Sequence, residues 1–367
     1  MKHSTITEGK VTLVIPKLSD VPSRGMPVFY NPIMKENRDI AVALVSAWLK
    51  NRKKPACIAL PLAGTGIRAI RFAKEIPKKH IKCICINDYS AEAIKLVKKN
   101  LKKNAVTNCI QTSTKDANIF LLESCGFDYI DIDPFGSPNP FLDASIKRLS
   151  RDSILAVTAT DTAPLCGTYI KACKRKYNAT PLRCPMMHEI GLRILIRKVQ
   201  IAGLQYDRAL SPILSYSKDH YFRLYLLNHK NKTHCEAIHG LHGFIKYCTE
   251  CQFHESTHSN TAEPCPNCKT ELSIVGPLFI GRLFYEFFID SMNVESKTLE
   301  TIKEEMHIPT LGYYHIPSIT KHLGKPSAPY EKLFEKIKKK GYSVSRTHFN
   351  AEAIKTNMPI KELEKLF

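Results

Sequence analysis

The sequence predicts an α/β protein with a mostly parallel sheet, followed by a cysteine-rich segment and a smaller α+β region. Three observations support this. Apolar runs typical of strands alternate with helical patterns up to about residue 160, which is the signature of a parallel sheet covered on both faces. Two C-x-x-C pairs follow, and the remaining chain has helical patterns rich in lysine. We therefore expect domains over residues 1–240, 241–275 and 276–367.

Length and composition set the broad class. The chain has 367 residues and is 44% hydrophobic, which is too long for one typical domain and enough to bury a sizeable core. No apolar run of about 18 residues occurs, so no membrane span is expected. The first residues lack the apolar core of a secretory signal. We expect a cytoplasmic protein, and no obligate protein partner is evident.

The charge is strongly basic. The formal net charge is +20 at pH 7. A lysine-rich soluble surface would account for it, but so would a polyanionic partner, because contacts to phosphates release bound counterions and drive binding. We favour nucleic acid as that partner.

The first elements follow from periodicity and capping. Residues 39–50 have helical spacing of apolar side chains, and residues 56–75 have the pattern of a strand, a glycine turn and a helix. Residues 81–104 repeat the strand and helix, with Ser90 as the expected N-cap.

Later elements are expected in the same way. Residues 127–135 and 153–160 are apolar runs typical of buried strands, and residues 220–229 alternate in the manner of a late strand. Residues 330–342 predict an amphipathic helix with a basic end, and the last expected strand or β-wing lies in residues 342–349.

The glycine turn is a candidate ligand site. Gly64 and Gly66 stand between a strand and a helix, where glycine lets the backbone approach a ligand and the helix start offers free N–H groups. Asp88 follows the next strand, where an acid can accept hydrogen bonds from both ribose hydroxyls. The pair fits a dinucleotide or S-adenosylmethionine equally well. Ala69 stands where the third glycine of the dinucleotide pattern would be, which disfavours NAD.

Asp133, Pro134 and Phe135 follow the third expected strand. The carboxyl end of a parallel strand lines the ligand crevice of an open sheet. An acid and an exposed ring there suit an exocyclic amine on a flat base, with the carboxylate accepting its N–H bonds and the ring stacking. A tight turn that caps the strand would explain the prolines alone. Asp131, two residues earlier, is a weaker candidate.

The chain resembles the tRNA guanine-26 N2-dimethyltransferase family over nearly its whole length. The motifs that carry the resemblance are "FYNPIMKENRD" (29–39), "AGTGIRAIRFA", "DIDPFGSP", "AVTATDTAPLCG" (156–167), "HEIGLRIL" (188–195), "SYSKDHYFRLY" (215–225), "GYSVSRTHF" (341–349) and "AIKTN" (353–357). The resemblance implies a class I, Rossmann-like methyltransferase fold. One departure from many methyltransferases is the absence of an acid before the glycine turn, where Leu60 and Pro61 stand.

The resemblance also implies site residues. S-adenosylmethionine would be the cofactor and tRNA the partner. Asp133 would be the catalytic acid, and Phe29 and Phe135 would contact the base. The implied cofactor contacts, with Asp116 and Ala117 at the adenine, are Arg38, Gly64, Gly66, Arg68, Asp88, Asp116 and Ala117.

The cysteine-rich segment predicts a zinc ribbon. Among thirteen cysteines, the pairs Cys248–Cys251 and Cys265–Cys268 have the spacing of four thiolates around tetrahedral zinc. Buried free cysteines are the alternative interpretation. A closed four-thiolate shell leaves no open position for water, so we expect the zinc to be structural.

The C-terminal region is expected to bind RNA. The basic end of the expected helix and the residues after it suggest a phosphate-binding surface in a winged-helix-like module, although a solvated lysine face would look the same. The candidate contacts are Lys338, Lys339, Arg346, His348 and Lys355.

Together these features predict S-adenosylmethionine-dependent dimethylation of N2 of guanine 26 in tRNA. Three alternatives remain. An amino-methyltransferase acting on adenine N6 of another nucleic acid would use the same turn. A zinc-ribbon RNA-binding protein would carry the fold without activity. A nicotinamide dehydrogenase is the weakest of the three.

Overall fold

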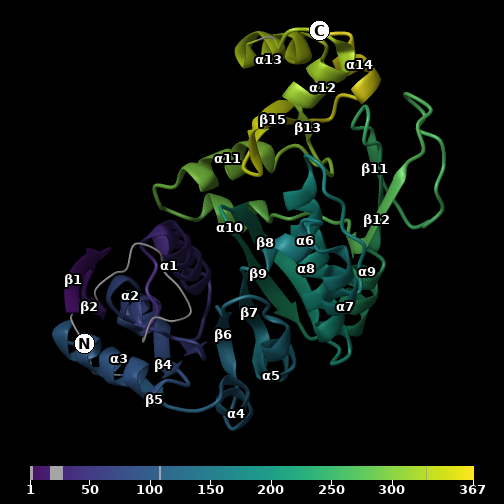
Figure 1. Ribbon diagram of the computed structural model, residues 1–367. Helices are drawn as coiled ribbons and strands as arrows, with labels where there is room; N and C mark the ends of the chain where they lie inside the picture. Colours follow the sequence, from purple (N-terminus) through teal and green to yellow (C-terminus); the bar gives the residue numbers. More distant parts are fainter. Residues whose placement is uncertain (1–2, 17–27, 107–108, 328) are drawn as a thin grey trace.

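The computed structural model describes residues 3–16, 28–106, 109–327 and 329–367. In this part of the chain, seven strands form a central sheet in the order β5-β4-β3-β6-β7-β9-β8 (Figure 1). Strands β3 to β7 run parallel, whereas β9 is antiparallel to both of its neighbours. The sheet strands are β3 (Ala56–Leu60), β4 (Ile81–Asn87), β5 (Ile110–Ser113), β6 (Phe127–Ile132), β7 (Leu149–Ala159), β8 (Ala209–Lys218) and β9 (Tyr221–His229). The expected parallel sheet is confirmed, and β5 and β8 are additional strands.

Helices cover both faces of this sheet. Alternate residues of a strand point to opposite faces, so Ile58 belongs to one core cluster and Ala59 to the other. The first cluster includes buried side chains of α1, α2 and α3, and the second includes those of α5, α7 and α8. The helices up to residue 240 are α1 (Lys35–Lys50), α2 (Ile67–Glu75), α3 (Ala91–Lys103), α4 (Ala117–Leu122), α5 (Leu142–Lys147), α6 (Thr162–Leu165), α7 (Ile170–Tyr177), α8 (Met187–Leu204) and α9 (Lys232–His239), with short 3₁₀ turns η1 (Pro32–Met34), η2 (Lys78–His80) and η3 (Asn139–Phe141).

Local signals place several of these elements. Ser90 caps α3 by accepting a hydrogen bond from the Ala93 amide at 3.2 Å, as expected. The hairpin of β1 (His3–Glu8) and β2 (Val11–Pro16) was not expected. Its second strand is fixed to α3, because the Asn100 side chain exchanges two hydrogen bonds with the Val14 backbone.

The cysteine-rich segment forms its own three-stranded antiparallel sheet. Its strands are β10 (His242–Tyr247), β11 (His254–Thr257) and β12 (Ser273–Phe279), in the order β11-β10-β12. Strand β12 passes residue 275, where the sequence predicted a boundary. Gly276 also exchanges backbone hydrogen bonds with Thr180 in the preceding region, so the segment is joined to the main body.

The C-terminal region divides in an unexpected place. Helices α10 (Glu286–Asp290) and α11 (Lys297–Glu305) bury side chains such as Ile289 and Ile302 in the first core cluster of the main sheet. A separate cluster contains Leu333, Ile337 and Ile354. The elements around that cluster are β13 (Tyr314–His315), α12 (Ile316–Leu323), α13 (Tyr330–Lys339), β14 (Val344–Thr347), β15 (Asn350–Thr356) and α14 (Ile360–Glu364). Figure 1 places them at the end of the molecule away from the β1–β2 hairpin.

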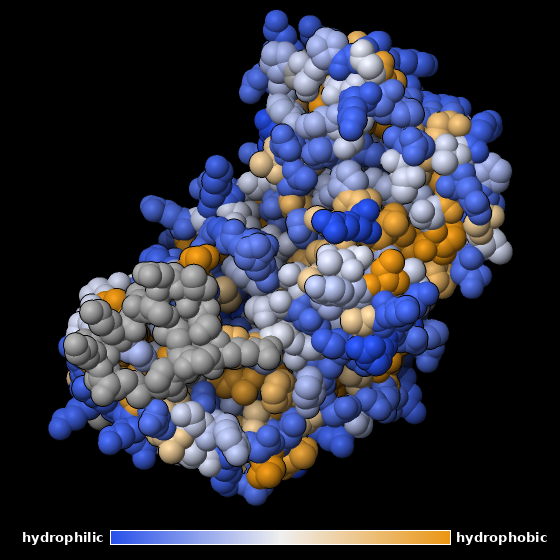
Figure 2. All heavy atoms as spheres, viewed as in Figure 1, coloured by the Kyte–Doolittle hydropathy of each residue, from blue (hydrophilic) through white to orange (hydrophobic). Residues whose placement is uncertain are grey.

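The exterior of the molecule is mostly polar on the face shown in Figure 2. Figure 2 shows a face covered mostly by hydrophilic residues, with smaller apolar patches between them. Among the residues that the structure describes, no helix combines the length and the apolarity needed to cross a bilayer.

Candidate functional site

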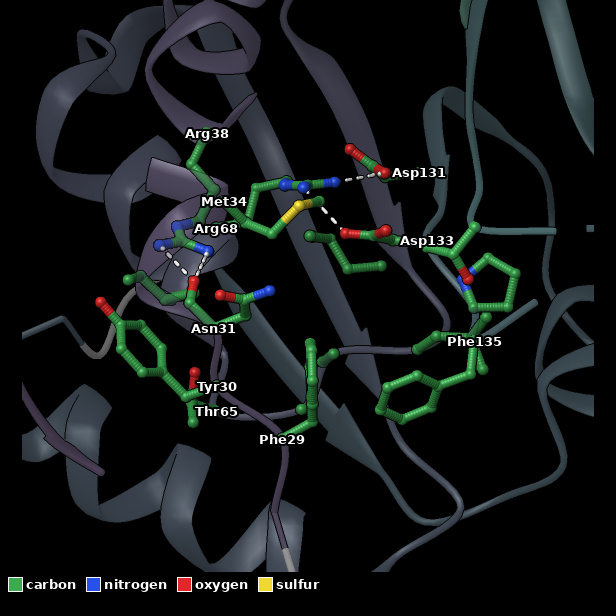
Figure 3. Close-up of a pocket in the computed structure, with 17 residues that line it drawn as sticks. Phe29, Tyr30, Asn31, Met34, Arg38, Thr65, Arg68, Asp131, Asp133 and Phe135 are labelled. Atoms are coloured by element: carbon green, nitrogen blue, oxygen red, sulfur yellow. Dashed lines mark hydrogen bonds and ion pairs between the residues drawn. The ribbon is translucent and has the colours of Figure 1, made fainter. Parts of the chain in front are cut away.

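A cavity of about 270 Å³ lies at the carboxyl ends of β3 and β6 (Figure 3). Its walls come from four segments: residues 29–38, the glycine turn with its flanks at 60–68, residues 131–135, and Thr160. The carboxyl edge of a parallel sheet is where α/β proteins bind ligands. Six predicted site residues line this one cavity, namely Phe29, Arg38, Gly64, Arg68, Asp133 and Phe135.

The glycine turn forms the floor between the strand and α2. Gly64 and Gly66 have φ angles of +54° and +75°, which side chains with a Cβ rarely adopt. A Cβ on Gly64 would lie 3.1 Å from the Phe29 carbonyl oxygen. Asp88 holds the turn in place, since its Oδ2 accepts a hydrogen bond from the Gly64 amide at 2.8 Å and its Oδ1 accepts one from the Ser90 amide at 2.9 Å.

Asp131 lies beneath the cavity in a network of buried charges. Its Oδ1 accepts hydrogen bonds from Arg68 at 2.6 Å and Arg223 at 2.9 Å. Its Oδ2 accepts hydrogen bonds from Arg223 at 2.8 Å and the Tyr129 hydroxyl at 2.7 Å. Burial raises the pKa of Asp131, but the charges of Arg223 and Arg68 outweigh burial and hold that pKa well below its usual range. Arg223 was not among the residues predicted from sequence.

Asp133 occupies a more open position at the same strand end. Its side chain is 29% exposed, against 1% for Asp131. Arg68 joins the two acids, because its Nη2 donates to Asp133 Oδ2 at 2.8 Å and also to Asn37 Oδ1 at 2.8 Å. In this structure Arg68 therefore orients Asp133, and its predicted contact with a cofactor stays a prediction.

Two phenylalanines form the outer wall beside Asp133. The rings of Phe29 and Phe135 meet edge to face, with centroids 4.5 Å apart and an interplanar angle of 76°. Phe135 is 44% exposed. A planar ring can stack on the exposed part of this pair, whereas a ring inserted between them would have to move them apart.

Arg38 is held by the N-terminal hairpin. Its Nε and Nη2 donate to the two Glu8 carboxylate oxygens at 2.7 and 2.6 Å, and its guanidinium also donates to the Asn31 carbonyl oxygen at 3.2 Å. Glu8 accepts a further hydrogen bond from the Tyr30 hydroxyl, whose pKa burial raises to about 12. Tyr30 and Asn31 line the cavity and were missed in the sequence, although both lie inside the motif at residues 29–39.

The remaining predicted cofactor residues lie outside the cavity wall. Asp116 caps α4, with its Oδ1 accepting from the Asn118 amide at 2.8 Å. The neighbouring Ala117 is buried. This loop is tied to the end of β4, because the Asn87 side chain exchanges hydrogen bonds with the Lys115 backbone. Asp88, Asp116 and Ala117 thus follow neighbouring parallel strands at the sheet edge where the cavity opens.

The four predicted zinc ligands come together. The Sγ atoms of Cys248, Cys251, Cys265 and Cys268 all lie within 4.8 Å of one another. The shortest separations are 3.3 Å between Cys248 and Cys268 and 3.6 Å between Cys251 and Cys265. Four thiolates at such separations can surround one tetrahedral zinc ion. The cluster could therefore hold zinc.

Three of the predicted RNA contacts are at the surface. Lys338 and Lys339 are exposed at the end of α13. Arg346 is partly buried, and its guanidinium lies 3.5 Å from the Tyr330 ring centroid and donates to the Ala351 carbonyl oxygen.

The structure contradicts the two other predicted RNA contacts, His348 and Lys355. Lys355 is only 5% exposed and donates to the Gly312 carbonyl oxygen. Burial raises the pKa of the nearby Glu189, but the charges of Lys355 and Arg193 bring it down to about 2, so Lys355 balances a buried acid. The His348 side chain is 1% exposed and contacts Glu305. Both side chains are largely buried and have partners within the protein, so they are not part of an exposed phosphate-binding surface.

Comparison with known proteins was consistent across three measures. The family model described as N2,N2-dimethylguanosine tRNA methyltransferase matches residues 9–367. A relative from Aquifex aeolicus, named tRNA (guanine(26)-N(2)/guanine(27)-N(2))-dimethyltransferase, is 37% identical and aligns over 98% of this chain and 94% of its own. A tRNA (guanine(26)-N(2))-dimethyltransferase from Methanothermobacter thermautotrophicus is also 37% identical, over 99% and 98%. The solved structure of Trm1 from Pyrococcus horikoshii with S-adenosyl-L-methionine is 32% identical, covers 99% of both chains and has a TM-score of 0.85.

Proposed function

Because the chain belongs to the N2,N2-dimethylguanosine tRNA methyltransferase family, we propose that it transfers methyl groups from S-adenosylmethionine to N2 of guanine 26 in tRNA. One structural observation supports the proposal most directly. The glycine turn, a partly exposed carboxylate and a pair of aromatic rings converge on one cavity at the carboxyl edge of the sheet. Each part has a role in bringing a methyl donor to an amine on a flat base.

The donor fits the glycine side of this cavity. The backbone at Gly64 carries no side chain that would fill the space beside Phe29. When bound there, S-adenosylmethionine would supply an electrophilic methyl group on its sulfonium. Asp88 would hold the ribose hydroxyls with its remaining lone pairs, and the loop of Asp116 and Ala117 would border the adenine. Arg38 and Arg68 would face the cofactor across the cavity.

Asp133 would act on the acceptor. The lone pair of the guanine N2 amine is delocalised into the ring, which makes the amine a weak nucleophile. A carboxylate that accepts its N–H bonds stabilises the positive charge that develops as nitrogen becomes tetrahedral. Arg68 fixes the carboxylate before the substrate arrives, so little reorganisation is needed when the methyl group is held close and in line.

The base must leave its helical stack to reach Asp133. Enzymes that modify a base inside a paired region extrude it into a pocket. Phe135 and Phe29 would pack on the extruded guanine, as base-stacking aromatics do in many RNA-binding sites.

Three further features belong to the same proposal. The main sheet and its helices form a Rossmann-like methyltransferase domain. The four cysteines bind one structural zinc ion. The sequence predicted three units over 1–240, 241–275 and 276–367. We propose instead that the last unit begins after Met306, because β12 crosses residue 275 and α10 and α11 pack on the main core.

Mass spectrometry of nucleosides from tRNA, incubated with the protein and S-adenosylmethionine, tests this function. The expected product is N2,N2-dimethylguanosine, which fragment mapping should place at position 26. Because the Aquifex relative is named for guanines 26 and 27, the mapping must cover both positions. Formation of N6-methyladenosine instead would favour the adenine alternative. The absence of any methyl transfer by an intact protein that binds tRNA would favour the non-catalytic one.

A further inference from the structure

The segment between β7 and α8 has an unusual charge pattern. Residues 162–188 contain no aspartate or glutamate. They contain five exposed cations, of which Lys176 is paired with Asp161 at 2.9 Å and the other four are Lys171, Lys174, Arg175 and Arg183. An ordinary solvated helix face usually mixes both signs of charge. An acid-free stretch of this length instead produces a positive potential that attracts phosphates.

This segment is tied directly to the loop that follows Asp133. The Tyr177 hydroxyl lies 3.0 Å from Ser137 Oγ, and the Asn139 side chain donates to the Lys176 carbonyl oxygen at 3.0 Å. Gly136 is bound to Thr160 through both its amide and its carbonyl. The C-terminal end of α7 is therefore held against the loop that follows Asp133, and that loop is in turn bonded to Thr160 in the cavity wall.

An exposed aromatic side chain stands at the start of α7. Tyr169 is 61% exposed and Ile170 is 45% exposed. Burial of side chains of this size against a partner is favourable, and they are followed immediately by Lys171. Aromatic rings next to cations along a groove are the usual means of binding single-stranded nucleic acid, since the ring stacks on a base while the cations follow the backbone.

We propose that α7 and Tyr169 form the surface that binds the tRNA strand flanking the target guanine, with Tyr169 stacking on a base next to it. Lys171, Lys174 and Arg175 contact the phosphates of that strand. Extruding the guanine leaves its neighbours unstacked on one side, and the Tyr169 ring replaces part of the lost stacking. This inference rests on the proposed function, because it names the part of the protein that presents tRNA to the cavity.

A matched pair of charge reversals tests the phosphate contacts. The variant Lys171→Glu/Lys174→Glu is compared with Lys95→Glu/Lys98→Glu on α3, whose lysines are also exposed and have the same spacing. Figure 1 places α3 and α7 toward opposite ends of the central sheet. We expect the α7 variant to raise the KM for tRNA at least about tenfold and to lower the slope of log affinity against log salt by about 2, since each lost phosphate contact removes about one. The α3 variant should change both values much less. Calorimetry should give unchanged cofactor affinity for both.

The stacking role of Tyr169 needs a different readout. A tRNA with 2-aminopurine at position 26 increases in fluorescence when that base leaves its stack. We expect Tyr169→Ala to lose most of this increase and to lower the single-turnover rate roughly 5- to 100-fold, the range for one stacked base. Tyr169→Phe should retain both.

The outcomes separate this inference from the proposed function. No methyl transfer by the wild-type protein would overturn the function itself. An active wild-type protein with equal losses in the α7 and α3 variants would show an effect of net charge alone and would overturn the α7 surface. Normal fluorescence and normal rates in Tyr169→Ala would overturn the stacking role.

Discussion

At the residue scale, two acids on one strand end show how neighbours set the role of a side chain. Asp131 and Asp133 point to the same side of β6, yet Asp131 is enclosed by Arg68, Arg223 and Tyr129, whereas Asp133 opens toward the cavity. A buried carboxylate between two guanidinium groups cannot be removed without leaving uncompensated charge. Asp131 therefore holds Arg68 and Arg223 in place beneath the cavity. Asp133 is the acid that is accessible from the cavity.

Replacing each acid by asparagine should separate these roles. We expect Asp131→Asn to lower the free energy of unfolding by about 3–5 kcal/mol, the usual loss when one partner of a buried ion pair is removed. Asp133→Asn should change stability little, because its pair with Arg68 is partly exposed. It should lower the single-turnover rate by about 10²–10³, the scale of one lost transition-state contact.

Urea unfolding and single-turnover methyl transfer to tRNA measure the two effects, with cofactor affinity determined separately. Asp133→Ala should be at least as slow as Asp133→Asn while still binding S-adenosylmethionine. A near-normal rate in Asp133→Ala would mean that the acid only caps the turn after β6.

A second residue-scale prediction concerns how the stability of the fold depends on pH through His242. Burial, together with the charge of Arg197, lowers the pKa of His242 to about 4, and its Nε2 lies 2.9 Å from Gln200 Oε1. The unfolded chain has a histidine pKa near ~6.5 and takes up the proton first. The stabilisation from neutral His242 is therefore complete above about pH 6.5 and is lost as the pH falls toward 4.

The variant His242→Gln tests this coupling. Between pH 7 and pH 5 it should lose less unfolding free energy than the wild type, by roughly 1–2 kcal/mol. His307→Gln, at an exposed histidine, serves as the control and should follow the wild type. Identical pH profiles for all three proteins would contradict the low pKa of His242.

At the element scale, the cysteine end of the β10–β12 sheet depends on its cysteines, whereas β10 and β12 also pack on the main core through side chains such as Ile245 and Leu278. The sheet has only three strands, of which β11 is four residues long, and its own cluster of buried side chains consists mainly of the cysteines and Leu272. So small a core contributes little stability by itself. A metal that joins the two C-x-x-C turns would supply the missing free energy.

Metal content and thermal unfolding test this element. We expect about one zinc per chain in the purified protein and a lower Tm for Cys248→Ser/Cys251→Ser. The double variant Cys109→Ser/Cys125→Ser, at two exposed cysteines, should leave Tm and metal content unchanged. An unaltered Tm in the first variant would count against a structural metal.

At the scale of the whole molecule, the cavity and the basic end of α13 are far apart (Figure 1). The cavity belongs to the main sheet, while α13 lies in the C-terminal unit at the other end of the molecule (Figure 1). Lys338, Lys339 and Lys340 are exposed at the end of α13. Under the proposed function, tRNA is large enough to contact both regions at once, and we expect the C-terminal unit to contribute affinity while the cavity contributes the chemistry.

Charge reversal on α13 should therefore affect binding only. In Lys338→Glu/Lys339→Glu/Lys340→Glu we expect a higher KM for tRNA and a flatter dependence of affinity on salt, because fewer counterions are released. Cofactor affinity should not change. A matched triple reversal at the exposed Lys99, Lys102 and Lys103 of α3 controls for net charge. A tRNA affinity that does not respond to salt in the wild type would refute the electrostatic interpretation.

Some properties of this protein follow from the sequence alone because they are local. The helix at 39–50, the cap at Ser90 and the glycine turn each depend on residues within a few positions of one another, and the structure confirms all three. The two C-x-x-C pairs and the motifs shared with the family are likewise linear patterns. These patterns were enough to predict the parallel sheet, the cysteine cluster and the family.

Other properties were decided by the tertiary structure, because they depend on residues far apart in the chain. Asp131 became a buried support when packing brought it to Arg223, which is 92 positions away. His348 and Lys355 carry the charge pattern of an RNA-binding surface, but β14 and β15 bring them against Glu305 and Gly312 in the interior. The sequence does not distinguish a basic residue that is exposed to water from one that is paired with a buried acid, because tertiary packing alone determines its surroundings.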